Sequence, residues 1–288
     1  MKHLSLCAAS VLFSAWLNAQ SSASVSSFPF SNGVHPTLSF QFEGTDVKYV
    51  ESWWKDELKR VSREVSNKKE VIGAAALLPQ ITGDTVRVLV KAEQRKGAPF
   101  TVAHVAFLTK EGWLGPSSDA RAFEGAKAYV QQQSTMLRRQ LAQQELTIAE
   151  KGMARLNQEL SNLQRDKERM ESSIEKAKQR AAEAVQEQER LVREHEELAR
   201  KVGVQRKENA DEPDAEGEKA LAALLKEQSK SQARHAKAIA EEADQKKKAE
   251  ELAWEVKKNL EAQERKRGEL VKQEQLVKAM REKLDSIR

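Results

Sequence analysis

A seven-residue repeat of apolar positions dominates the second half of the chain. From Ala142 to Val202, two positions of every heptad keep one register for nine heptads, and 15 of these 18 residues are apolar. A sustained repeat of this kind buries one seam between supercoiled helices. It predicts a coiled-coil helix over residues 126–205. The seam residues that we single out are Leu156, Leu160, Leu163, Met170, Ile174, Leu191 and Leu198.

The repeat stops between residues 206 and 217. Pro213 and five acidic residues within Asp211–Glu218 predict a solvated acidic turn there. A calcium loop is the alternative, but the EF-hand spacing and its central glycine are absent. Apolar heptad positions resume in a second coiled-coil helix over residues 218–288. Its seam includes Leu221, Leu224, Leu252 and Val256.

The two helical segments are nearly equal in length, and this predicts that they fold back on each other. Residues 130–202 and 217–288 span 73 and 72 residues. If Val202 and Gly217 flank the turn, Leu198 faces Leu221 and Leu163 faces Val256, so that a positions meet d positions as antiparallel pairing requires. The competing arrangement is a parallel multimer, in which each segment pairs with its own copy.

The first half has mixed periodicity. Leu38, Phe40 and Phe42 alternate with polar residues, which predicts a half-buried strand. Residues 47–65 follow with apolar positions three and four apart, which predicts one helical face. The apolar positions of that face are Val47, Val50, Trp54, Leu58, Val61 and Val65.

Three further strands are predicted at residues 70–81, 85–93 and 100–109, followed by a loop and a helix that continues into the coiled coil. The element order β-α-β-β-β-α over residues 36–125 predicts a small α+β domain. The predicted fold class is therefore an α+β N-terminal domain followed by a long all-α antiparallel coiled-coil hairpin.

Composition supports this division. Of the 15 aromatic residues, only Trp254 lies beyond Tyr129, so a globular core belongs to the first half. Lys and Arg total 49 against 44 for Asp and Glu, and the two signs are interspersed. Mixed charge of this kind is typical of a solvated helix surface, and we expect no nucleic-acid partner.

The first residues have the pattern of an export signal. A short basic start precedes an apolar run from Leu4 to Leu17, and Ala19 is a small residue at the expected cut. We predict a signal peptide over residues 1–19, removed near Ala19, and a flexible Ser-rich segment over residues 20–35. Cleavage removes Cys7, the one cysteine. No second apolar segment is long enough to span a membrane, so we expect no transmembrane segment in the mature chain. The predicted location is the bacterial periplasm or the cell exterior.

The run QFEGTDVKYVESWWKDELKR resembles the opening of uncharacterised exported bacterial proteins. These proteins carry a small α+β domain followed by a long coiled coil, with an EAAK-like junction that corresponds here to residues 123–127. The resemblance is one of pattern and implies no activity and no functional residue.

Two features of the α+β domain are candidates for function. Tyr49 and Trp53 lie off the apolar face of the predicted helix and are possible partner-binding residues. The alternative is that they pack under the next loop or against the start of the long helix. His104 lies in a predicted strand among apolar neighbours, and a structural role for it outweighs a ligand role.

Catalytic signatures are missing from the sequence. It contains no Gly-x-Ser-x-Gly, no phosphate-binding loop and no His-Glu-x-x-His. We therefore expect no enzyme, no cofactor and no metal site.

The function that these patterns favour is that of a structural or interaction protein of the bacterial envelope. Its small domain would bind a protein partner, and its coiled coil would serve as a spacer or oligomerisation arm, with a homo-oligomer as one possibility. The alternative is a periplasmic holdase chaperone. An adaptor of a secretion or efflux system is a weaker third reading, since no strand is predicted after residue 217.

Overall fold

The computed structural model describes residues 23–288, so the predicted signal peptide and Cys7 lie outside the described residues. The chain divides into two units. The first contains the residues up to Glu150 together with Leu276–Arg288, and the second contains Lys151–Gln275. An α+β domain followed by an antiparallel coiled-coil hairpin, as predicted, is confirmed.

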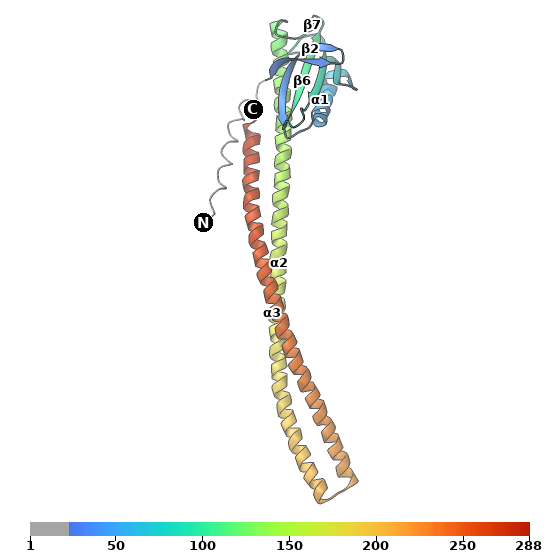
Figure 1. Cartoon of the computed structure of the whole chain (residues 1–288), viewed down its shortest axis with the longest axis vertical. Coiled ribbons are helices and arrows are strands. Elements are labelled where there is room, and N and C mark those ends of the chain that lie inside the picture. Colours follow the sequence, from blue (N-terminus) through green and yellow to red (C-terminus); the bar gives the residue numbers. More distant parts are fainter. Residues whose placement is uncertain (1–22) are drawn as a thin grey trace. The chain divides into compact units, whose positions relative to one another are not determined.

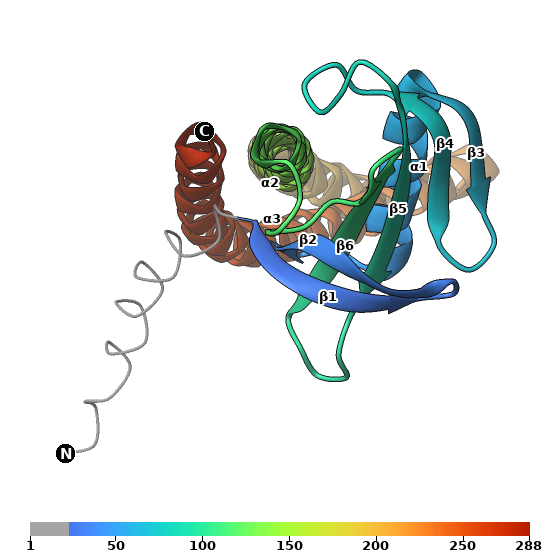
Figure 2. The same ribbon diagram turned by 90° about the horizontal axis from the view of Figure 1, so that it is seen from above.

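The first unit is built on one antiparallel sheet. Its order is β1-β2-β6-β5-β4-β3, with β7 paired to β6, so β1 and β3 form the two edges (Figure 2). The strands are β1 (Ser24–Phe30), β2 (Gly33–Glu43), β3 (Ser62–Asn67), β4 (Val71–Leu77), β5 (Thr85–Glu93), β6 (Phe100–Thr109) and β7 (Gly112–Trp113).

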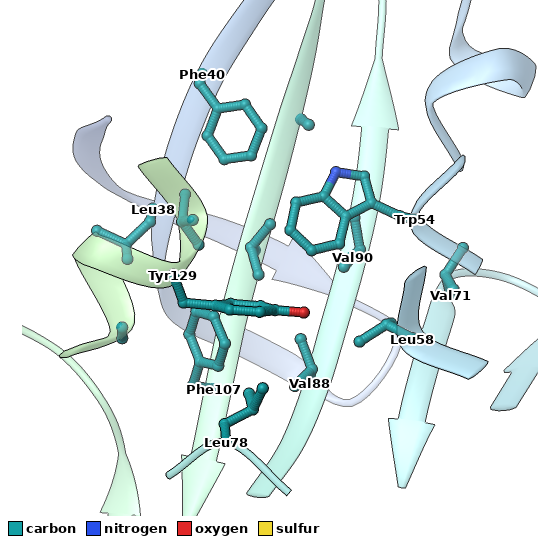
Figure 3. Close-up of a cluster of buried hydrophobic side chains, with 14 of the residues drawn as sticks. Leu38, Phe40, Trp54, Leu58, Val71, Leu78, Val88, Val90, Phe107 and Tyr129 are labelled. Atoms are coloured by element: carbon teal, nitrogen blue, oxygen red, sulfur yellow. The ribbon is translucent and has the colours of Figure 1, made fainter. Parts of the chain in front are cut away.

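The main core lies between one face of this sheet and two helices. Helix α1 (Val47–Val61) begins at the cap residue Asp46, whose carboxylate accepts a hydrogen bond from the Tyr49 amide at 2.7 Å. Its Trp54 is fully buried and lies near Tyr129 of the long helix α2 (Ala120–Asp211). Figure 3 shows the two rings on the same face of the sheet as Val88 and Val90 of β5 and Phe107 of β6.

The predicted flexible segment over residues 20–35 is wrong where the structure describes it, because β1 occupies residues 24–30 and β2 begins at Gly33. Apolar packing and side-chain hydrogen bonds stabilise the hairpin formed by β1 and β2. Phe28 and Phe30 cover a small second cluster on the opposite face of the sheet. The Ser26 hydroxyl lies 2.9 Å from the Thr37 hydroxyl and 2.7 Å from the Ser39 hydroxyl. The serines therefore bind the neighbouring strand instead of solvating a loop.

A second correction concerns the end of the first helix. The predicted apolar face ran on to Val65, but α1 ends at Val61 and β3 begins at Ser62. Val65 pairs with Gly73 of β4 instead. The four-residue spacing of Val61 and Val65 is compatible with both a helix and a strand. Both residues are β-branched, and β-branched residues favour strands.

The second unit is a hairpin of two helices. The α2 helix and α3 (Ala215–Ser286) run antiparallel and are joined by residues 212–214 (Figure 1). Ion pairs cross between the helices, with Arg234 Nη2 at 2.6 Å from a Glu194 oxygen and Lys266 Nζ at 2.9 Å from a Glu159 oxygen. In the first unit, the last turns of α3 lie along α2, where Arg281 Nη2 is 2.8 Å from a Glu150 oxygen.

The predicted turn over residues 206–217 is too wide, since α2 continues through Gly203 to Asp211. Asp214 caps the next helix by accepting a hydrogen bond from the Gly217 amide. Of the residues expected to break the helix, Pro213 alone lies in the link where the chain reverses direction. A glycine inside a helix costs about 1 kcal/mol relative to alanine, too little to end a helix of this length.

The register of the hairpin also differs from the prediction. Leu163 was expected to face Val256, but its carbonyl accepts a hydrogen bond from Gln263 Nε2 at 3.5 Å. The same alignment places Gln188 opposite Ser231. In the structure, Gln188 Nε2 lies 3.3 Å from the carbonyl of Ala238 instead, which is again seven residues further along α3. The pairing is displaced by one heptad, so a positions still face d positions.

None of the seam residues named in the sequence analysis is fully exposed. Leu191 and Leu198 are buried, and the others are half-buried. Along residues 23–288, no helix is long and apolar enough to cross a membrane.

Candidate functional site

Tyr49 and Trp53 of α1 contact the long helix through their polar atoms. Trp53 Nε1 donates to Gln140 Oε1 at 3.1 Å. The Tyr49 hydroxyl accepts from Gln140 Nε2 at 2.9 Å and from Gln144 Nε2 at 2.8 Å. Both aromatic side chains are half-buried, and the Trp53 ring packs edge-on against Trp54 at 5.4 Å between centroids. The predicted pair is thus fixed against the start of the long helix and still partly open to solvent.

These two aromatics line a surface groove of about 360 Å³ between α1 and α2. On the α2 side, Met136 is 43% exposed. The groove therefore combines two aromatic rings and a flexible thioether with polar edges, a composition typical of protein-binding surfaces. The remaining lining residues are Ser52, Asp56, Glu57, Arg60 and Gln140.

The carboxylates of the groove are already paired. Glu57 is buried and accepts from Arg60 Nη1 at 3.1 Å. Asp56 accepts from Lys59 Nζ at 2.7 Å, and this contact lowers the pKa of Asp56. Burial, with a smaller contribution from the Glu57 charge, raises the pKa of the Tyr129 hydroxyl.

Sequence reasoning identified the α1 half of this groove and missed the α2 half. Met136, Gln140 and Gln144 lie in a region that we treated as continuous coiled coil. One signal could have found them. The glutamines of residues 131–144 are unusually dense, and uncharged amides suit a helix that contacts another polar surface.

His104 lies on the far face of the sheet, away from the groove. Its Nδ1 is 2.7 Å from the Ser39 hydroxyl, and its ring stacks on Phe28 with 4.2 Å between centroids. Glu93 approaches Nε2 at 3.5 Å. Burial lowers the pKa of His104, and the Glu93 charge opposes this shift only in part. Its surroundings are those of a neutral structural histidine.

Between residues 23 and 288, no three His, Asp or Glu side chains are grouped so that they could hold a metal ion.

Comparisons with known proteins found a likeness to a solved coiled-coil structure. No protein-family model matches the chain, and no curated protein matches it. Among solved structures, a coiled-coil segment of Pyrococcus yayanosii Smc is similar, with 21% sequence identity and a TM-score of 0.47. The match covers 54% of this chain and 66% of that segment, so the chain spans just under two thirds of the segment's length.

Proposed function

We propose that this chain is an exported structural or interaction protein of the bacterial envelope. Its sheet unit binds a protein partner in the groove between α1 and α2, and its coiled-coil hairpin serves as a spacer or oligomerisation arm. The export part of the proposal is supported by the N-terminal sequence, where a basic start, an apolar run and a small residue follow each other.

The observation that carries the binding role is the fixed geometry of the groove. The Tyr49 hydroxyl and the Trp53 indole N–H are both held by Gln140. Their rings are therefore oriented before any partner arrives, and a partner need not bear the entropy cost of ordering them. Met136 completes the surface with a side chain that adapts to different shapes.

The hairpin supports the arm role by its composition. Its seam is mostly apolar, its outer surface is charged, and many of its ion pairs lie within one helix. Exposed pairs of this kind contribute little stability each, but they keep a long helix soluble.

The proposed binding site is tested by photocrosslinking in the native host. A photoreactive amino acid replaces Ser52, which is exposed in the groove, or Lys68, which is exposed beside β3. We expect a discrete adduct from position 52 and none from position 68. Met136→Asp should abolish the adduct, because the carboxylate would place a solvated charge in the groove.

The matched control is Ile148→Asp, which makes the same kind of change at another exposed position of α2. It should leave the adduct intact. The binding role is wrong if positions 52 and 68 give the same adducts, or if Met136→Asp and Ile148→Asp act alike. Circular dichroism of both variants establishes that the fold is retained.

A holdase role is the second candidate, and exposed apolar side chains on the hairpin favour it. Trp254 is 55% exposed, Leu260 45% and Val271 53%. If these residues hold unfolded clients, the protein suppresses aggregation of an unfolded outer-membrane protein, and a Trp254→Ser, Leu260→Ser double variant loses this effect. Full suppression by the double variant would exclude that role for these two residues.

A further inference from the structure

Helix α3 carries a second heptad stripe that faces solvent. Between residues 222 and 243, one exposed row repeats at alternating spacings of three and four and contains no charged residue. The neighbouring outward positions do carry charge, at Lys226, Lys230 and Lys237 among others. The central members of this α3 stripe are Leu225, Ser229, Gln232, Ala236 and Ile239.

The α3 stripe continues the seam that already joins the two helices. Val185 and Val192 of α2 border a groove together with His235 of α3. His235 is four residues from Ile239, so the two lie on one helix face. Ile239 is 46% exposed and Val192 is 43% exposed. A seam between two helices alone needs only a and d positions, whereas an apolar third position on one flank is typical of helices that pack in larger bundles.

The opposite flank of the hairpin has different chemistry. There Arg234 and Glu194 form a cross-helix ion pair at 2.6 Å, and Glu187 pairs with Arg190. One flank of this stretch is thus closed by a cross-helix ion pair. On the other flank the α3 stripe itself is uncharged, and on α2 the groove is bordered by the valines together with Glu189 and Arg193, which pair with each other at 3.8 Å.

The order of residues in the α3 stripe identifies the partner. Read in either direction from Gln232, the stripe passes a small residue, a large aliphatic residue and an alanine: Ser229, Leu225 and Ala222 one way, Ala236, Ile239 and Ala243 the other way. A near-palindrome on a helix is complementary to itself when a second copy runs antiparallel. Each Leu225 then faces an Ile239, which is the isologous contact that a two-fold axis requires.

The available area suffices for a dimer. Twenty-two residues of helix extend about 33 Å, and the flanks of two adjacent helices offer a width of roughly 20 Å. Roughly 650 Å² per copy, or about 1,300 Å² in total, lies within the range of stable protein interfaces.

We propose that the α3 stripe, with Val185 and Val192, is the interface between two copies of this chain. The two hairpins form an antiparallel four-helix bundle with the two-fold axis at Gln232. This inference specifies the oligomerisation arm of the proposed function, and it does not depend on the groove in the sheet unit.

The mature chain is the material for the test, with its mass measured by light scattering over a concentration series. We expect a dimer for the unchanged chain. Leu225→Lys with Ile239→Lys should weaken dimerisation by about 100-fold or more, because four ammonium groups would be desolvated in the interface. The control pair is Val204→Lys with Val271→Lys. These residues are 57% and 53% exposed and lie outside the α3 stripe, so the control should remain dimeric.

Cysteine substitution tests the position of the axis. In the mature chain, Gln232→Cys should oxidise rapidly to a disulfide-linked dimer. Ala233→Cys points about 100° away on the helix and should not. A chain that is monomeric at about 100 µM, a dimer that survives both lysines, or equal crosslinking at 232 and 233 would each overturn the proposal. Photocrosslinking at Ser52 is unaffected by any of these results.

Discussion

The register of the hairpin can be tested with two pairs of cysteines. Gln188→Cys is combined either with Ala238→Cys, whose backbone Gln188 contacts at 3.3 Å, or with Ser231→Cys, which would face it in the register that lies one heptad away. Cys7→Ser is included in both chains. We expect the pair at 188 and 238 to form an intramolecular disulfide and the pair at 188 and 231 to remain reduced.

The expected contrast follows from helix geometry. Seven residues of α-helix correspond to about 10.5 Å, whereas a disulfide requires the two Cβ atoms to lie within about 4.5 Å. The second pair can therefore close only if one helix slides by a whole heptad. Once formed, the disulfide between positions 50 residues apart should raise the free energy of unfolding by about 4 kcal/mol.

The assay is mild oxidation of dilute protein, followed by a non-reducing denaturing gel and peptide mass mapping. Equal or faster closure of the pair at 188 and 231 would refute the register described above. Disulfide-linked dimers as the main product from both pairs would favour the parallel multimer instead. Thermal unfolding with and without reductant then measures the expected gain in stability.

Three further predictions concern single features. Gly125→Ala should destabilise the protein by more than about 2 kcal/mol, because its Cβ would collide with the Gln80 carbonyl oxygen. Gly203→Ala meets no atom and should stabilise α2 by up to about 1 kcal/mol. Urea unfolding of both variants checks this. Because the pKa of His104 is lowered from 6.5 by burial, the unfolded chain binds the proton more readily, so stability is complete above about pH 6.5 and is lost as the pH falls through the folded-state pKa. His104→Gln should flatten that loss in urea titrations between about pH 5 and 7.5, and an unchanged slope would contradict it. N-terminal mass spectrometry of the protein from its host should find a chain that starts near Gln20, and an intact Met1 would contradict the export signal.

The sequence predicts the presence of the hairpin better than its register. Heptad periodicity identifies which face of each helix is buried, and a shift by a whole heptad leaves that face unchanged. Our alignment placed the turn between Val202 and Gly217, which matched leucine layers such as Leu198 with Leu221 but set Lys167 against Leu252. The structure instead brings Gln188 within 2.7 Å of Glu242, so a polar seam residue keeps a hydrogen-bonding partner. An unsatisfied polar group costs about 1–3 kcal/mol, comparable to what one better apolar layer contributes.

The first strand was missed for a related reason. Its serines are typical of a loop by composition, but here Ser26 bonds to two hydroxyls of the next strand. Only the alternation of Phe28 and Phe30 signals a strand, and it is too short to outweigh the serines. The α2 half of the groove could not be predicted either, because a residue such as Gln140 contacts Tyr49 across 91 positions of sequence.

The edges of the sheet have a consequence for behaviour at high concentration. The edge strand β1 contains Pro29, which has no N–H to offer, and the edge strand β3 exposes Arg63 and Glu64. Proline and charge on an edge strand oppose the strand-to-strand pairing that leads to amyloid-like ribbons. With both edges protected, the protein can reach high concentrations without polymerising through its sheet. Any concentration-dependent assembly would then involve the surfaces of its helices.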